Sequence, residues 1–239
     1  LDKYMFIYVN RPIVDDLIRI KYSKSETVTS IEKVKHEIAR ACMEKTGFTK
    51  GLEITSMADI PAGSGLGSSS CYTVGLLNAL HALNRDYISL DALAEEASYI
   101  EMDKLKKPMG KQDQYLAAYG GFTVLDIDSN GKVKVEKLNI SYNTIENLKR
   151  NLLMFYTGKQ RLNKNILGEQ DKLTQKDDKQ VLDSLHYIKE SGYKILDIVK
   201  SGNIIELGKM FDEHWQYKKK LAKGVSNPEF DNIYELARK

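Results

Sequence analysis

Cysteine is scarce in this sequence, which excludes a disulfide-stabilised fold. Only two cysteines, Cys42 and Cys71, occur in 239 residues. They lie far apart and lack the spacing of a metal-binding pair. Both stand in apolar segments with helical periodicity, so we expect buried free thiols and a reducing, cytoplasmic environment.

Long hydrophobic runs and an excess of one charge are also missing. No stretch approaches the roughly 20 apolar residues that a membrane-spanning helix needs, and we expect no secretory leader. Lys and Arg number 36 against 33 Asp and Glu and are spread along the sequence, which argues against a nucleic-acid surface. The densest basic run, 218–220, is better explained as a solvated helix face than as a binding site. We therefore expect no membrane and no nucleic acid as partner.

Only four prolines interrupt the chain, and its periodicity predicts an α+β protein of two domains, 1–148 and 149–239. In the first we expect strands at 5–9, 17–22 and 52–60 and helices at 31–46, 71–83 and 112–119. Asp91 can cap a further helix, and a hairpin joins 122–127 to 132–138 around Asn130-Gly131. In the second we expect a strand at 152–157, helices at 160–175, 178–200 and 203–222, and a last helix from Pro228. The second domain should thus be rich in helices and carry an incomplete sheet.

A strand, a loop of glycine and serine, and an apolar helix follow one another between residues 52 and 83. The glycines of the loop let the backbone adopt positive φ and approach an anion closely, and the helix N-terminus adds free N–H groups. The loop matches neither the Walker A pattern nor the dinucleotide fingerprint. A flexible turn without ligand is the alternative, but the strand and the helix on either side favour an anion site. The residues expected to bind phosphate are Pro61, Gly63, Ser64, Gly65, Leu66, Gly67, Ser68, Ser69 and Ser70.

Two acidic residues follow the loop. Asp113 stands where a helix should begin, and the simple alternative for it is a helix cap. Glu101 lies twelve residues earlier and, without context, would be an exposed helical glutamate. Phosphoryl transfer needs a metal and a group that orients the attacking hydroxyl. One carboxylate and one serine suffice for Mg²⁺, which keeps water and phosphate as its other ligands.

The loop at 61–70 resembles the second signature motif of the GHMP kinase family (galactokinase, homoserine kinase, mevalonate kinase, phosphomevalonate kinase), commonly P-x-x-x-G-L-G-S-S-A. Ser70 stands where alanine is usual. The resemblance implies a two-domain GHMP-kinase-like fold with ATP as phosphoryl donor. It implies Ser69 and Glu101 as ligands of Mg²⁺, and Asp113 as the catalytic base or as the carboxylate that only orients the hydroxyl.

Longer stretches resemble the branch of this family that acts on heptose phosphates. They are LDKYM, KHEIARACMEKTG, EITSMADIPAGSGLGSSSCYTVGLLNALHAL and GKQDQYLAAYGG. This resemblance implies a sugar phosphate as partner and transfer to the anomeric hydroxyl of a heptose 7-phosphate. The far phosphate needs cationic partners, for which Lys111, Arg161 and, as a weaker third, Arg11 are candidates; a surface ion pair is the alternative for each. Another acceptor (galactose, fucose or mevalonate) and a non-catalytic nucleotide-binding homologue stay open, as does a homodimer.

The first and third signature motifs of the family have no match in the sequence. They would lie before Leu1 and after Lys239, so we expect a chain truncated at both ends. A degenerate homologue is the alternative, and the presence of Ser69, Glu101 and Asp113 speaks against it.

Overall fold

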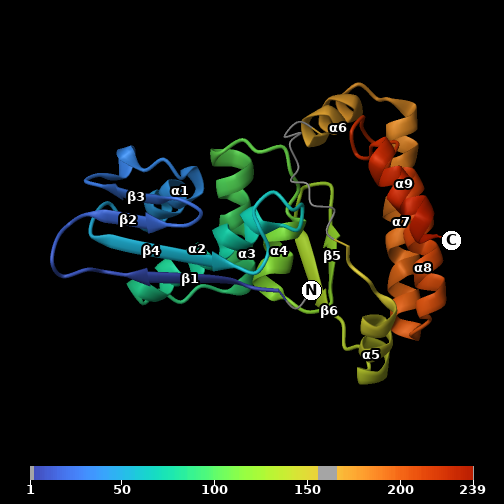
Figure 1. Cartoon of the computed structure of the whole chain (residues 1–239), viewed down its shortest axis with the longest axis horizontal. Coiled ribbons are helices and arrows are strands. Elements are labelled where there is room, and N and C mark those ends of the chain that lie inside the picture. The colour runs from blue at the N-terminus through green and yellow to red at the C-terminus, as the bar shows by residue number, and fades with distance from the viewer. Residues whose placement is uncertain (1–2, 156–165, 239) are drawn as a thin grey trace. The chain divides into compact units, whose positions relative to one another are not determined.

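The computed structural model describes residues 3–155 and 166–238 (Figure 1). Two compact units divide between Lys137 and Leu138. The predicted domain boundary at residue 148 falls inside a helix, α5 (Tyr142–Asn151), that the sequence pattern does not predict.

The first unit is built on a four-stranded sheet of order β1-β4-β2-β3. Strand β4 runs antiparallel to β1 and parallel to β2, and β2 and β3 form an antiparallel pair. The strands expected at 5–9, 17–22 and 52–60 are confirmed, while the short polar β3 has no sequence signal of its own. The strands are β1 (Met5–Asn10), β2 (Ile18–Lys21), β3 (Ser25–Val28) and β4 (Leu52–Ala58).

The prediction of one helix over 31–46 is wrong in its first half. A 3₁₀ turn, η1 (Ile31–Lys33), ends at Val34, whose backbone is extended (φ −68°, ψ 121°). Helix α1 (Glu37–Thr46) begins only after His36, whose Nδ1 accepts the Ala39 N–H at 3.2 Å and caps the helix. The apolar spacing of 31–46 is therefore met by two elements that share one buried face.

Helix α2 (Ser68–Asn84) is the central helix of this unit and packs against β1, α1, α3 and α4. Its residues Leu76, Leu77 and Leu80 are fully buried in the core. Gly75 lets it approach β1 closely, because a Cβ there would lie only 3.1 Å from Cγ1 of Ile7. The core thereby fixes the end of β4 and the start of α2, between which the glycine loop lies.

Two α-helices, a π-helix and a hairpin complete the described part of the first unit: α3 (Leu90–Ser98), the π-helix η2 (Tyr99–Lys104), α4 (Gln112–Tyr119), β5 (Thr123–Ile127) and β6 (Val133–Lys137). The expected cap at Asp91 is wrong, because Ser89 caps α3 by accepting the Ala92 N–H and Asp91 lies in the first turn. Helix α4 has the predicted bounds, and the hairpin around Asn130-Gly131 is confirmed, with φ 76° at the glycine.

Helices make up the described part of the second unit. The predicted helices correspond to α6 (Ile166–Gln175), α7 (Lys179–Ser201), α8 (Ile204–Lys218) and α9 (Pro228–Ala237). Residues 152–155, where a strand was expected to begin, form no strand, and residues 156–157 lie outside the described part. A strand needs a hydrogen-bonding neighbour, and the described residues supply none here.

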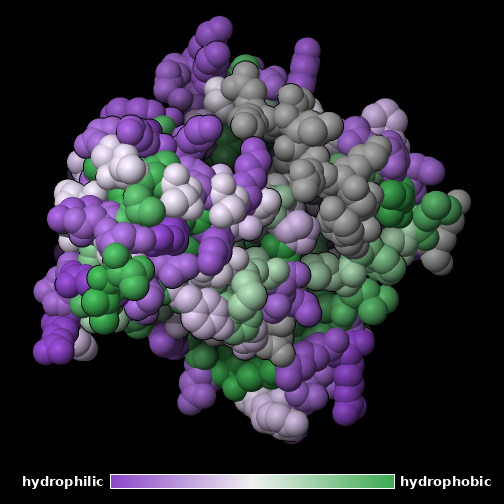
Figure 2. All heavy atoms as spheres, turned by 60° about the vertical axis from the view of Figure 1, so that its left-hand side comes forward, coloured by the Kyte–Doolittle hydropathy of each residue, from purple (hydrophilic) through white to green (hydrophobic). Residues whose placement is uncertain are grey.

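Among the described residues, no helix is both long and apolar enough to cross a bilayer. On the face drawn in Figure 2, hydrophilic side chains are widely spread and hydrophobic ones occur in groups between them. Both cysteines are free thiols; Cys42 is buried, but Cys71 is half-buried rather than buried as expected.

Candidate phosphate-binding and catalytic site

The glycine-rich loop has the backbone geometry that its sequence predicts. Gly63, Gly65 and Gly67 have φ of 80°, 79° and 71°, values that favour glycine. Gly67 is also the N-cap of α2, where no side chain caps the helix and no acidic residue occupies the first turn. The free N–H groups of that turn are therefore open to an anion.

One hydroxyl of the loop supports the same conclusion. Ser64 Oγ is buried and has no hydrogen-bond partner among the described residues. Buried polar groups are nearly always satisfied, so this oxygen fits a loop that closes around a ligand.

Glu101 lies at the centre of a buried polar cluster. It is fully buried on the π-helix η2, an irregular turn that occurs often at functional sites. Its Oε2 accepts hydrogen bonds from Ser70 Oγ and Gln114 Nε2, both at 2.7 Å, and its Oε1 accepts one from Ser69 Oγ. One carboxylate thereby ties together the start of α2, the π-helix and α4.

Asp113 faces the same end of α2. A Cβ built on Gly67 would lie 3.4 Å from Cγ and Oδ2 of Asp113, so this carboxylate sits directly against the last glycine of the loop. Burial raises the pKa of the nearby Cys71 thiol, and the negative charges of Asp113 and Glu101 raise it further. The structure thus brings together Gly67, Ser69, Ser70, Glu101 and Asp113, which the sequence analysis selected; their roles stay predictions.

A cavity of about 380 Å³ opens beside the loop. Residues 61–63, Ser68 and Ser69 form one side, and Tyr22, His36 and Tyr72 contribute aromatic rings. The His36 ring stacks on Tyr72 with 4.7 Å between centroids. Burial lowers the pKa of His36, although the Glu26 carboxylate opposes the shift, so the ring is a neutral aromatic surface. A flat, apolar space next to a phosphate loop suits a nucleotide base.

This aromatic cavity was missed in the sequence. Its residues come from β1, the β2–β3 turn, the start of α1, the end of β4 and α2. Only the packing of these elements brings them together, and no local motif marks them.

Lys107 was also missed. Its Nζ donates to Ser69 Oγ at 3.1 Å and lies 3.4 Å from Glu101 Oε1. The dipeptide Lys106-Lys107 before Pro108 marks the end of a helix, but nothing in that pattern tells which lysine turns inward.

Lys111, the first of the predicted sugar-phosphate cations, is paired with groups outside the loop. Lys111 Nζ donates to both oxygens of Glu95, at 2.9 and 2.8 Å, and to the Gly131 carbonyl at 2.9 Å. Although Lys111 lies two residues before Asp113 in the sequence, its side chain links α3 to the hairpin turn. Arg161 lies outside the described residues, and its role stays a prediction.

Arg11 lies far from the loop. Its guanidinium donates to Asn84 Oδ1 at 2.9 Å and covers the Phe48 ring at 4.8 Å. Asn84 is the last residue of α2, and a helix of that length separates it from the loop by roughly 25 Å. We therefore leave Arg11 out of the proposed site.

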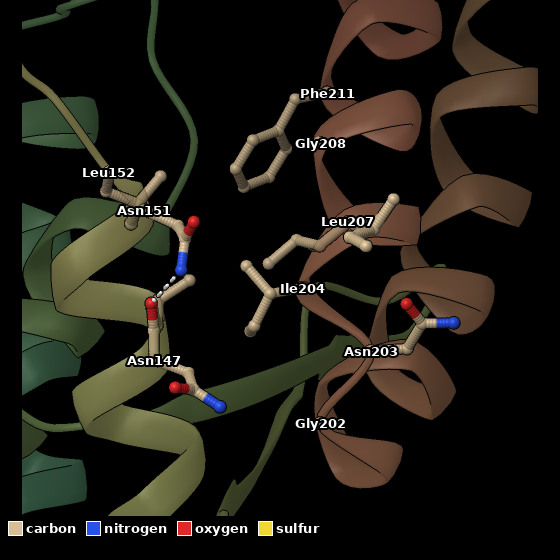
Figure 3. Close-up of a pocket in the computed structure, with 11 residues that line it drawn as sticks. Asn147, Asn151, Leu152, Gly202, Asn203, Ile204, Leu207, Gly208 and Phe211 are labelled. Atoms are coloured by element: carbon tan, nitrogen blue, oxygen red, sulfur yellow. Dashed lines mark hydrogen bonds between the residues drawn. The ribbon is translucent and has the colours of Figure 1, made fainter.

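A second cavity, of about 560 Å³, lies in the helical unit between α5 and α8 (Figure 3). Asn147 and Asn151 face Ile204, Leu207 and Phe211 across it. Its lining contains no charged side chain. It offers nothing to bind a triphosphate, and the candidate site remains the loop.

The residues at the loop fit a magnesium ion. No group of three or more acidic, histidine or cysteine side chains gathers as a metal site in the described part of the chain. Ser69 Oγ and Glu101 Oε1 nevertheless both face one cation, the ammonium of Lys107. Oxygen donors of this kind suit Mg²⁺ when phosphate and water supply its other ligands.

The described residues thus place a glycine loop at a strand-to-helix junction, with two carboxylates at the helix N-terminus, in an α+β fold. Residues 32–121 match the family described as "GHMP kinases N terminal domain". This segment is similar to the N-terminal domain of that family, as the loop motif implied.

Relatives give the comparison in more detail. The chain is 31% identical over 193 residues to D-glycero-alpha-D-manno-heptose 7-phosphate kinase of Campylobacter jejuni, covering 80% of this chain and 56% of that protein. It is 27% identical over 197 residues to L-fucokinase/L-fucose-1-P guanylyltransferase of Bacteroides fragilis, covering 80% and 20%. The chain thus spans little more than half of the first of these relatives and a fifth of the second.

A solved structure has the same fold. The crystal structure of a D-glycero-D-manno-heptose 1-phosphate kinase from Bacteriodes thetaiotaomicron superimposes with a TM-score of 0.77, at 22% identity, over 92% of this chain and 68% of that one. The predicted GHMP-kinase-like α+β fold is therefore confirmed.

We expect Gly67→Ala to weaken ATP binding about tenfold. The backbone at φ 71° costs a non-glycine residue roughly 1–2 kcal/mol, and the new methyl group would come into contact with the Asp113 carboxylate. Titration with ATP under calorimetry measures the effect. Gly47→Ala is the control, because Gly47 has φ 79° with nothing within 4 Å of its Cβ position and ends α1 away from the loop. Equal loss of ATP affinity in both variants would contradict the assignment of the loop.

Proposed function

We propose that this chain belongs to an ATP-dependent sugar kinase that phosphorylates the anomeric hydroxyl of D-glycero-D-manno-heptose 7-phosphate to the 1,7-bisphosphate. The observation that carries the proposal is the meeting of Ser69, Glu101 and Asp113 at the open N-terminus of α2. The 31% identity to a heptose 7-phosphate kinase supports the choice of acceptor.

The donor side of the site binds ATP. The backbone N–H groups of the loop and of the first turn of α2 hold the phosphates, and the aromatic cavity receives the base. Ser69 and Glu101 would hold Mg²⁺. The chemistry that Mg²⁺ supplies when bound is neutralisation of the charge on the phosphate oxygens.

The acceptor side depends on Asp113. Its carboxylate orients the anomeric hydroxyl toward the γ-phosphorus and receives its proton as the new oxygen–phosphorus bond forms. The bond from the γ-phosphorus to the bridging oxygen breaks, and ADP leaves. Lys111 and Arg161 are the candidates for the distal phosphate, and Lys111 would exchange Glu95 for it. Because ATP and sugar phosphates are intracellular metabolites, the proposal includes a cytoplasmic location.

A coupled assay of ADP release across acceptors tests this function. We expect heptose 7-phosphate to give a kcat/KM at least about 10²-fold above galactose, L-fucose and mevalonate, because a site built for a phosphate group rejects substrates that lack it. Unphosphorylated heptose is the matched control and should lose most of this advantage. A higher value for fucose or mevalonate would assign the chain to that acceptor. ATP binding without turnover of any acceptor would favour a non-catalytic nucleotide-binding protein.

A further inference from the structure

We propose that Lys107 holds the place of the divalent metal between Ser69 and Glu101, and that it withdraws to Glu37 when metal and ATP bind. The inference rests on the proposed function, since it concerns the same site. It adds a mobile cation of the protein itself that competes with the metal and sets how tightly the metal binds.

The inner position of Lys107 coincides with the metal ligands. Its Nζ lies 3.1 Å from Ser69 Oγ and 3.4 Å from Glu101 Oε1, the two atoms that we assign to Mg²⁺. The backbone directs the side chain there, because the Lys107 N–H donates to the Glu101 carbonyl at 2.9 Å and folds the segment back over η2.

A cation is needed at this position when no metal is bound. The Glu101 side chain is 0% exposed, and a buried carboxylate is costly unless it is paired and hydrogen-bonded. Ser69, Ser70 and Gln114 supply neutral donors, whereas Lys107 supplies a positive charge, with its Nζ 3.4 Å from Glu101 Oε1. The ammonium thus keeps the metal ligands in position before the nucleotide arrives.

An outer position is available on α1. The Glu37 carboxylate lies 3.7 Å from Lys107 Nζ and its side chain is 60% exposed. The Lys107 side chain is itself 26% exposed, and its flexible four-carbon stem needs only a rotamer change to move outward.

Lysine and metal cannot both occupy the inner position. Two cations within 3–4 Å of the same oxygen repel strongly in a partly buried site. Binding of the metal therefore includes the cost of displacing Lys107, and Glu37 lowers that cost by receiving the ammonium.

Binding of Mn²⁺ to the complex with a non-hydrolysable ATP analogue, followed by electron paramagnetic resonance, tests the inference. Lys107→Met removes the charge and keeps the length of the side chain. We expect it to tighten Mn²⁺ binding about tenfold. This factor corresponds to a lysine that occupies the inner position in about nine of ten molecules, so that the metal position is free in about one of ten. Without metal and nucleotide, in EDTA, the same variant should melt at a lower temperature, and saturating Mn²⁺ and analogue should close that difference.

Glu37→Gln gives a second test at an exposed position. It removes the outer partner of Lys107, so we expect Mn²⁺ binding to weaken about threefold. In a protein that already carries Lys107→Met, the same change should have no effect on Mn²⁺ binding. Glu44→Gln is the control. Glu44 lies on α1 like Glu37 and forms a similar surface ion pair, with Lys104 as its partner. This variant should leave Mn²⁺ affinity unchanged.

The outcomes separate this inference from the proposed function. Unchanged Mn²⁺ affinity in Lys107→Met would overturn it, and weaker affinity would show instead that Lys107 binds the phosphates beside the metal. A protein that binds neither Mn²⁺ nor the analogue in any variant would contradict the proposed function itself.

Discussion

Asp113→Asn should lower kcat by about 10²–10⁴ while ATP binding changes little. The amide keeps the shape of the side chain against Gly67 but cannot accept the proton of the attacking hydroxyl. The loss should therefore fall on turnover, since the proposed phosphate-binding loop is untouched. Steady-state kinetics and calorimetric titration with ATP measure the two effects separately.

Asp91→Asn is the matched control for this variant. Both aspartates lie in the first turn of a helix, Asp91 in α3 and Asp113 in α4, so each change removes the same interaction with a helix dipole. Only Asp113 lies at the loop. If both variants keep full turnover, Asp113 is a structural residue of α4 and the catalytic assignment is wrong.

Glu101→Gln should abolish Mn²⁺ binding in the presence of an ATP analogue and destabilise the protein. The amide nitrogen of the new glutamine would face groups that now donate hydrogen bonds to the Glu101 carboxylate. Ser69 and Ser70 can turn their hydroxyls, but the Gln114 amide group cannot become an acceptor without turning over. We expect a loss of about 2–3 kcal/mol in the free energy of unfolding, measured by denaturation in urea.

Glu95→Gln separates the metal effect from the structural one. Glu95 also accepts bonds from a lysine and a neutral donor, Lys111 and Tyr115, at 2.8 and 2.5 Å, but it lies away from the loop serines. Burial raises the pKa of Glu95, and the bonds from Lys111 and Tyr115 outweigh that effect and lower it. The Gln variant should lose stability and keep its affinity for Mn²⁺. A Glu101→Gln protein that still bound Mn²⁺ normally would make Glu101 structural only.

The sequence by itself determined the elements whose signals are local. The loop needs glycine where φ is positive, so its motif predicts its backbone. Helix α4 has the predicted bounds, and the turn at Asn130-Gly131 specifies its hairpin. These features depend on the conformational preferences of a few consecutive residues, which do not need the rest of the fold.

Helix boundaries that depend on competing contacts were harder to predict from the sequence. The segment 31–46 has the apolar spacing of one helix, yet the cap at His36 and the extended Val34 divide it. Helix α5 has no buried residue, and the sequence analysis did not predict it. In both places packing and capping outweigh periodicity.

Only the tertiary structure decided which charged side chains meet. Glu101 resembles its helical neighbours Glu95 and Glu96 in sequence, and it becomes the buried centre of the site because the π-turn η2 aims it at Ser69 and Ser70. Arg11, selected by charge alone, packs at the opposite end of α2. Burial and pairing depend on contacts between segments tens of residues apart, whereas residue type and spacing describe only the chain close to each residue.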